Sequence, residues 1–163
     1  MKYRIHNFST IENKRRSFTL KTYNLHRFID AQLRDYPNAL TEIKGGKKQS
    51  HWMWYIFPQL GGLGRTEISE YYAIQDIDEA RAYMQEPLLC SHLLEICTAL
   101  LEQKTDDANK IFGFPDDMKL KSSMTLFAQA CPDQEIFQKV LDKFFNGIPD
   151  QKTIDLIKEN TAH

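Results

Sequence analysis

The sequence predicts an all-α fold, a compact single domain of about eight short to medium helices in orthogonal packing. Apolar residues recur at helical spacing along most of the chain after residue 23. Capping residues, prolines and glycines divide this pattern into segments of helical length. An alternating strand pattern competes only at residues 50–59, whose tryptophan, tyrosine and isoleucine would also suit a strand.

Composition limits the classes of function. A chain of 163 residues is long enough to bury a core without metals or disulfides. Its 21 basic and 22 acidic residues leave a net charge of −1, so no global field favours nucleic acid or a membrane surface as a partner. Three cysteines without metal-ligand spacing indicate a reducing compartment and no metal site. Because neither a membrane span nor a signal peptide is evident, we expect a cytoplasmic protein without a cofactor.

Residues 1–22 differ from the rest of the chain. They carry six basic side chains against one acid, Glu12, and show no sustained periodicity. We interpret them as a basic, loosely ordered extension rather than a nucleic-acid-binding arm, because basic tails are common and unspecific. The single helical domain then covers residues 23–163.

The first helices follow from a cap, a proline and a pair of glycines. Asn24 is expected to cap a helix, and Pro37 to open a second, short one that ends at the glycines 45–46. Further on, Ser50 could cap the aromatic segment, and Thr66 is another candidate cap. The apolar positions of the first helix are Leu25, Phe28, Ile29 and Leu33.

The later helices have clearer punctuation. Asp76 and Glu79 resemble a capping box for a helix that ends before Pro87, and Pro87 begins the next helix. That helix has the strongest apolar stripe of the chain: Leu89, Leu93, Ile96, Cys97, Leu100 and Leu101. The remaining helices are expected to start at Thr105 or Asp106, at Asp116 or Asp117, at Asp133 and after Pro149, with Gly113 and Gly147 closing the first and third.

Three polar groupings remain once the apolar stripes are assigned to the core. The first is the basic glycine turn of residues 44–51. If Ser50 caps a helix, the free N–H groups beside the lysines would bind an anion. A solvated helix end, with lysines at its negative pole, accounts for the same residues equally well.

The second grouping is the loop of residues 58–66. Three of its residues are glycines, which let the backbone approach a ligand closely, and Arg65 could hold a phosphate or carboxylate through two hydrogen bonds. Gln59 begins this loop and is a candidate ligand-binding residue. The glycine spacing matches neither a dinucleotide-binding loop nor a P-loop, and a plain connector is the favoured alternative.

The third grouping lies in residues 112–127. A capped helix with one surface ion pair is the simpler interpretation. In the functional one, the aspartates act as general acid or base and the other polar residues bind an anion in a cleft. Paired aspartates could also hold magnesium, but they are common at helix caps, and we predict no metal site. The residues concerned are Asp116, Asp117, Lys119, Lys121, Ser122 and Ser123.

The aromatic segment, residues 50–59, contains both tryptophans, Trp52 and Trp54. Such side chains suit a pocket wall as well as a core. His51 precedes them and is the best acid-base candidate of the chain, although a packed, hydrogen-bonded histidine is the commoner situation.

At these motifs the chain resembles a known family. The segments of residues 28–32, 50–59, 62–65, 72–74 and 112–127 are together similar to a mainly bacterial family, the domain of unknown function 1810. The resemblance extends from about residue 23 to residue 157 and implies a mainly helical fold without an established reaction. Some members carry a calpastatin label, which nothing in this sequence supports. Lys121 stands where members tend to have arginine, which weakens bidentate recognition there.

Two hypotheses of different class follow. In the first, the aromatic segment, the glycine loop with Arg65 and the segment of residues 112–127 meet in a tryptophan-lined pocket that binds a phosphorylated or nucleotide-like small molecule, with turnover as an open alternative. In the second, the aromatics form a core or a protein-binding surface, and the polar residues are caps and rim. Burial of both tryptophans away from Arg65 and Asp117 would contradict the first hypothesis. Nucleic-acid binding is a distant third.

Overall fold

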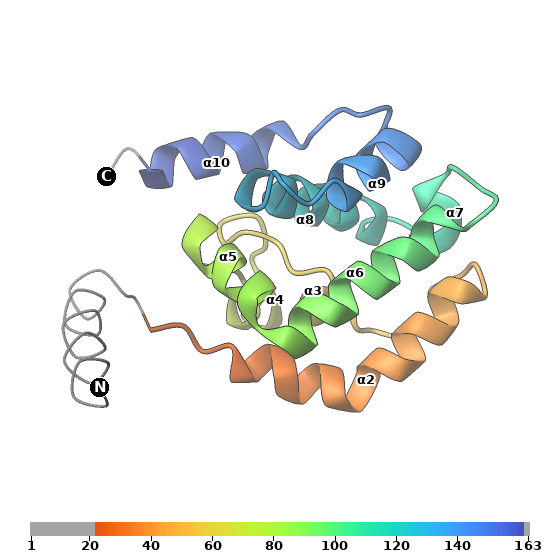
Figure 1. Cartoon of the computed structure of the whole chain (residues 1–163), viewed down its shortest axis with the longest axis horizontal. Coiled ribbons are helices and arrows are strands. Elements are labelled where there is room, and N and C mark those ends of the chain that lie inside the picture. The colour runs from red at the N-terminus through yellow and green to blue at the C-terminus, as the bar shows by residue number, and fades with distance from the viewer. Residues whose placement is uncertain (1–21, 162–163) are drawn as a thin grey trace, which may run out of the picture.

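Helices account for the regular structure of residues 22–161, the part of the chain that the computed structural model describes (Figure 1). No strand occurs among these residues, which confirms the predicted all-α class. All but one residue of the predicted N-terminal extension lies outside the described part, as do residues 162–163. The helices are α2 (His26–Lys44), α3 (Met53–Ile56), α4 (Glu67–Tyr71), α5 (Ile77–Gln85), α6 (Pro87–Leu101), α7 (Ala108–Phe112), α8 (Asp116–Ala130), α9 (Ile136–Phe145) and α10 (Gln151–Thr161).

The two helices expected before residue 45 are one continuous helix, α2, with Pro37 inside it. Proline lacks the N–H that would donate to the carbonyl of Leu33, four residues earlier. Leu33 is 65% exposed, so water can take the place of that donor. The expectation that Leu33 is a core residue is therefore wrong. The expected cap, Asn24, is also wrong: Leu25 occupies the N-cap position, without a side-chain cap bond.

The break between α5 and α6 is as predicted. Asp76 caps α5 by accepting a hydrogen bond from the backbone N–H of Glu79 at 2.9 Å. Glu86 caps α6 in the same way, through the N–H of Leu89, and Pro87 occupies the first turn. Local chemistry alone determines these ends, because a cap and a proline act within a few residues.

Three later helix starts differ from the prediction: α7 is capped by Asp107, which accepts from the backbone N–H of Asn109, and not by Thr105 or Asp106. The N-cap of α8 is Pro115 and that of α9 is Glu135, and neither makes a side-chain cap bond. Asp116 lies inside α8, where it forms ion pairs, and Asp117 accepts from the next N–H of the chain, that of Met118. In α8, tertiary and very local partners have thus taken up the two expected caps.

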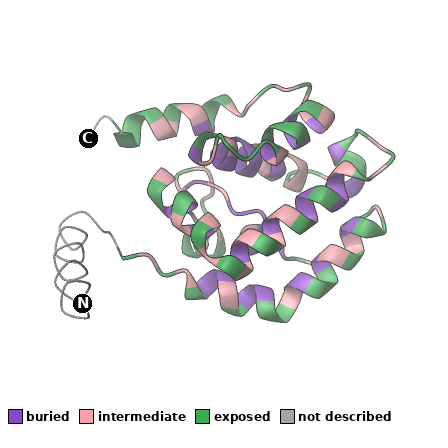
Figure 2. Ribbon diagram, in the orientation of Figure 1, coloured by how far each residue is buried: buried purple, intermediate pink, exposed green. Residues whose placement is uncertain are grey.

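Helix α8 is central to the fold and contacts α5, α7, α9 and α10. Helix α6 contacts α2, α5 and α9 and contributes the predicted apolar stripe to the core (Figure 2). Cys97 of this stripe is fully buried, and burial raises the pKa of its thiol. Together these helices enclose one apolar cluster that extends from Phe28 to Phe144.

A buried ion pair fixes the chain after α4. The Arg27 guanidinium meets both carboxylate oxygens of Glu79, at 3.0 and 3.2 Å. Arg27 also donates to the backbone carbonyls of Tyr71 and Ala73, each at 2.9 Å. Because these carbonyls belong to the last residue of α4 and to the segment after it, the pair positions the loop that precedes α5.

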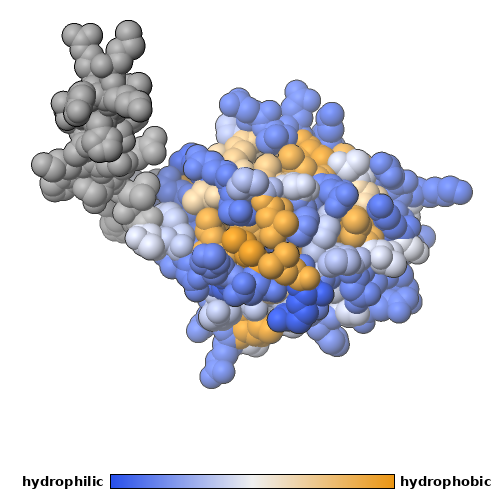
Figure 3. All heavy atoms as spheres, turned by 60° about the horizontal axis from the view of Figure 1, so that its bottom comes forward, coloured by the Kyte–Doolittle hydropathy of each residue, from blue (hydrophilic) through white to orange (hydrophobic). Residues whose placement is uncertain are grey.

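The described surface has mixed polarity. Figure 3 shows apolar side chains in separate groups bordered by hydrophilic ones on the face that it presents. No described helix has the length and apolar character needed to cross a membrane.

Candidate functional site

The basic glycine turn of residues 44–51 is occupied by groups of the protein itself. One carboxylate oxygen of Glu42 accepts hydrogen bonds from the backbone N–H groups of Gln49 and Ser50 and, at 3.1 Å, from the indole of Trp52. Burial opposes the charged form of Glu42, but these donors outweigh it and lower the pKa of the carboxyl. The expectation that Ser50 caps a helix and opens an anion site is wrong: Trp52 is at the N-cap of α3, and Glu42 uses the N–H groups.

Lys48 attaches this turn to α8. Its ammonium group lies 2.9 Å from a carboxylate oxygen of Asp116, and its backbone N–H donates to the carbonyl of Ile111 at 2.7 Å. The Lys48 side chain is only 7% exposed, so this is a largely desolvated pair. Asp116 therefore has a structural partner.

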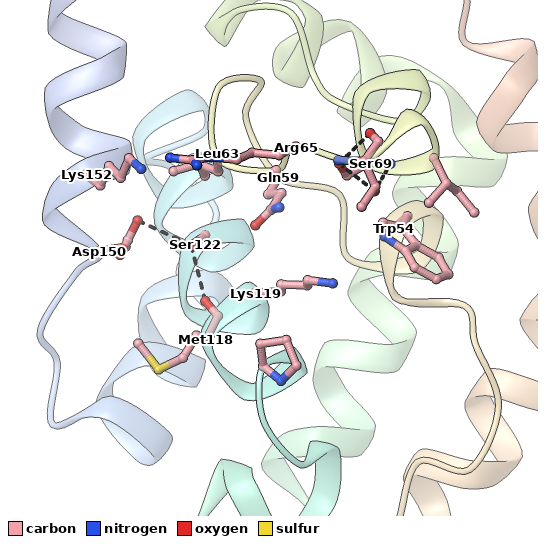
Figure 4. Close-up of a pocket in the computed structure, with 14 residues that line it drawn as sticks. Trp54, Gln59, Leu63, Arg65, Ser69, Met118, Lys119, Ser122, Asp150 and Lys152 are labelled. Atoms are coloured by element: carbon pink, nitrogen blue, oxygen red, sulfur yellow. Dashed lines mark hydrogen bonds between the residues drawn. The ribbon is translucent and has the colours of Figure 1, made fainter.

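The aromatic segment, the glycine loop and residues 112–127 all contribute side chains to one pocket of about 470 Å³ (Figure 4). Helix α3, the glycine loop, the start of α4 and the starts of α8 and α10 form its walls. The lining residues are Trp54, Gln59, Leu63, Gly64, Arg65, Thr66, Ile68, Ser69, Pro115, Met118, Lys119, Ser122, Asp150 and Lys152.

Positive charge exceeds negative charge among the lining residues. The cations are Arg65, Lys119 and Lys152, and the one carboxylate is Asp150. Within residues 22–161, neither Arg65 nor Lys152 has a hydrogen bond or ion pair of its side chain. Lys119 has a long ion pair, 3.5 Å, with Asp116. In Figure 4 the Arg65 side chain is directed toward the α10 side of the pocket, where Lys152 and Asp150 lie.

The opposite end of the pocket is aromatic. Trp54 is half-buried, and the Lys119 ammonium lies 5.3 Å from the centre of its ring, at cation–π distance. Gln59 lies between the two ends in Figure 4, and its side-chain amide has no partner among the described residues. The indole of Trp54, the ammonium group of Lys119 and the amide of Gln59 thus all line the same pocket.

The glycine loop owes its course to close contacts. A Cβ on Gly64 would lie 2.4 Å from the hydroxyl oxygen of Ser69, so only glycine fits there. Ser69 in turn completes a capping box with Thr66, the predicted cap, at the start of α4. This contact holds the Arg65 backbone beside the pocket.

Asp150 is held by three hydrogen bonds to one of its carboxylate oxygens, Oδ2. The donors are the hydroxyl of Ser122 at 3.2 Å and the backbone N–H and hydroxyl of Thr153 at 3.1 and 2.6 Å. The backbone N–H of Asp150 donates to the hydroxyl of Thr125 at 2.9 Å. The other carboxylate oxygen, Oδ1, has no partner among the described residues.

Several of the candidate residues lie outside the pocket lining. Trp52 is 1% exposed and packs against Phe57 and Phe112 in the core. Ser123 is fully buried, and its hydroxyl has no partner among residues 22–161. Lys121 lies 5.9 Å from the ring centre of Phe145.

The three candidate catalytic residues are not among the lining residues either. His51 is exposed, and the carboxylate of Asp117 accepts a hydrogen bond from the side-chain amide of Asn109 at 3.3 Å. Asp116 touches the pocket only through its ion pair with Lys119. The structure therefore brings together five of the candidates, Trp54, Gln59, Arg65, Lys119 and Ser122.

Sequence reasoning missed Asp150 and Lys152. One signal was available: Lys152 is in the first turn of α10, where the helix dipole disfavours a cation, and no acidic residue shares that turn.

The described residues hold no group of three or more His, Cys, Asp or Glu side chains placed to bind a metal. The arrangement can instead hold an anion by its cations, a ring by Trp54 and a hydrogen-bond donor by Asp150.

Comparisons place the chain in a family. Residues 22–157 match the family described as "Protein of unknown function (DUF1810)". The chain is 40% identical to a solved structure, the conserved hypothetical protein Rv1873 from Mycobacterium tuberculosis, with a TM-score of 0.81; the match covers 82% of this chain and 96% of that one. No curated protein matches at a significant level. The chain therefore belongs to the DUF1810 family of proteins of unknown function.

Proposed function

We propose that the pocket binds a small phosphorylated molecule of nucleotide type. The observation that carries this proposal is the pair Arg65 and Lys152, two cations without a partner among the described residues, on the wall of one pocket. Unpaired cations that face the same cavity repel each other, and a bound anion removes that cost. A volume of about 470 Å³ lies in the range of small-molecule sites.

The separation of the two ends supports a ligand with a ring as well as an anionic group. Arg65 and Lys152 would hold phosphate oxygens, and Trp54 would stack on the ring. Gln59, between them, offers both a donor and an acceptor for a polar group of the ligand. Lys119, beside Trp54, would neutralise further negative charge.

The proposal is one of binding, and turnover is not part of it. His51, Asp116 and Asp117 do not line the pocket, so a reaction there would need other groups. We also propose a cytoplasmic location, which the absence of a disulfide among Cys90, Cys97 and Cys131 supports.

Intrinsic fluorescence tests the proposal. Trp52 is buried in the core, so ligand-dependent quenching should come from Trp54 and disappear in Trp54→Phe. The wild-type protein is titrated with nucleotides, ADP-ribose derivatives, sugar phosphates and inorganic polyanions. Saturable quenching that Arg65→Ala weakens and Arg34→Ala leaves unchanged is the expected result, because Arg34 is an exposed arginine outside the pocket. A flat response across the panel would contradict the proposal.

A protein-interaction module is the alternative, and one observation favours it. Phe114 is 80% exposed next to the lining residue Pro115, and the lining residues Ile68 and Met118 are 41% and 44% exposed. Exposed apolar side chains of this size mark protein-binding surfaces when they are contiguous. Phe114→Ser separates the two functions: it should leave small-molecule quenching intact and abolish only an interaction with a protein.

A further inference from the structure

Asp150 is a carboxylate on the wall of a pocket whose other charged residues are cations. A site for a bare anion gains nothing from a negative charge, which would repel the ligand. The position of Asp150 therefore needs an explanation beyond the binding of phosphate.

Helix capping explains the position of only one of the two carboxylate oxygens of Asp150. The Oδ2 oxygen receives the hydrogen bonds of Ser122 and Thr153, and it thereby caps α10. An asparagine or serine would cap the helix as well, without the charge. The Oδ1 oxygen remains available, since no described residue donates to it.

The carboxylate is also held in place. Ser122 is 7% exposed and Thr153 is fully buried, so the donors to Oδ2 are fixed by the core. The backbone N–H of Asp150 is tied to Thr125, which is 1% exposed. An acceptor oriented by such a shell loses little conformational entropy when it binds a donor.

Resting on the function proposed above, we propose that Asp150 recognises a hydroxyl group of the ligand, next to its anionic group. Lys152 and Arg65 would hold the phosphate, and Oδ1 of Asp150 would accept from a hydroxyl on the adjoining part of the molecule. This assigns the ligand to the phosphate esters of polyhydroxylated compounds, such as a nucleoside monophosphate with its ribose diol, rather than to inorganic phosphates.

Three probes test this assignment by calorimetry: inorganic pyrophosphate, adenosine 5′-monophosphate and its 2′,3′-dideoxy analogue. The wild-type protein should bind the monophosphate about tenfold or more tightly than the dideoxy analogue, because a hydrogen bond to a charged acceptor is lost. In Asp150→Asn the preference should fall to about twofold or less, since an amide group can turn its donor side toward the pocket.

Pyrophosphate separates recognition from structural damage. Asp150→Asn removes a negative charge and keeps a capping side chain, so pyrophosphate should bind the variant as tightly as the wild type or more tightly. Ser122→Ala, which removes one donor to Oδ2, should reduce the preference for the diol without abolishing pyrophosphate binding.

These titrations distinguish failure of the role proposed for Asp150 from failure of the proposed function. Equal affinities of the wild-type protein for the monophosphate and its dideoxy analogue would overturn the role of Asp150 and leave the anion site in place. Loss of pyrophosphate binding in Asp150→Asn would make Asp150 a structural residue of the pocket and would likewise overturn the inference. If none of the three probes binds the wild-type protein, the proposed function fails as well.

Discussion

The Nζ atom of Lys119 lies 5.3 Å from the centre of the Trp54 ring. Lys119 belongs to α8 and Trp54 to α3, so this contact joins two segments that are more than sixty residues apart in the sequence. It is also the point at which the charged and the aromatic walls of the pocket meet. Substitution of Lys119 therefore tests how much this contact contributes to the free energy of unfolding.

Lys119→Ala should lower the free energy of unfolding by about 1 kcal/mol. The cation–π contact is worth about 0.5–1 kcal/mol at a partly exposed site, and the ion pair with Asp116 adds little, because it is long, at 3.5 Å, and Lys48 still pairs with that carboxylate when Lys119 is removed. Urea denaturation measures the change, and Lys139→Ala, in an exposed pair with Glu135, is the control. The same small loss in both variants would show that the Trp54 contact contributes nothing.

Glu79→Gln should be far more destabilising, by about 3–5 kcal/mol, because it leaves the Arg27 charge buried without its partner. Asp78→Asn is the matched control on the same helix: its pair with Arg81 is exposed, and the loss should stay within about 1 kcal/mol. Chemical denaturation of both variants provides the comparison. A cost of Glu79→Gln no larger than that of the control would contradict a desolvated pair.

Gly64→Ala should destabilise the protein by about 1–3 kcal/mol, since the new methyl group would overlap the Ser69 hydroxyl. The capping box of α4 and the position of Arg65 should change with it, so ligand quenching should weaken too. Gly45→Ala is the control, because its Cβ would have room at 3.4 Å from the nearest atom and its φ of −77° suits alanine. Thermal unfolding of the two variants should differ clearly; equal melting temperatures would argue against the close contact.

Glu42 predicts a pH dependence of stability. Its folded-state pKa is lowered below 4.5, because the hydrogen bonds from Gln49 and Ser50 outweigh the effect of burial. The resulting stabilisation is fully present above pH 4.5 and is lost as the pH falls through the folded-state pKa. Glu42→Gln should therefore be less stable than the wild type at neutral pH, and the difference should shrink in acid. Denaturation curves across this range test it, with Glu159→Gln as the control for removal of one exposed charge; a gap that stays constant with pH would contradict it.

The cysteines should differ in reactivity. Burial raises the pKa values of all three thiols, and Cys90 and Cys131 are only partly buried whereas Cys97 is fully buried. All three are therefore protonated at neutral pH. Cys97 is fully buried and should react with a thiol reagent only after unfolding. Mass spectrometry of the labelled native protein identifies the sites. Rapid labelling of Cys97 would indicate that the core around α6 opens.

Helix ends with local causes could be predicted from the sequence, whereas ends with tertiary partners could not. Asp76, Glu86 and Pro87 act within one turn, and the α5–α6 break follows from them. Asp116 has the same local pattern as a cap, but Lys48 competes for it from another segment. Pro37 was misread because proline is expected at a helix start, and the exposure of Leu33 was not visible in the spacing.

The sequence likewise predicted only those parts of the site that do not depend on tertiary packing. Trp52 and Trp54 are equivalent in the sequence, and only the packing of α3 turns one into the core and the other into the pocket. Asp150 and Lys152 come from the last helix, whose approach to the glycine loop depends on the whole fold. Arg65 and Lys119 were found because charged residues inside apolar motifs are informative without a structure.

The central claim is that Arg65 and Lys152 form an anion site, and calorimetric titration with inorganic pyrophosphate tests it most directly. The double variant Arg65→Ala/Lys152→Ala is compared with Arg34→Ala/Lys158→Ala, which removes the same charges outside the pocket. We expect the first variant to bind about tenfold or more weakly than the wild type, and the second to stay within about twofold. Equal affinities of the two double variants, or a wild-type protein that does not bind pyrophosphate, would contradict the claim.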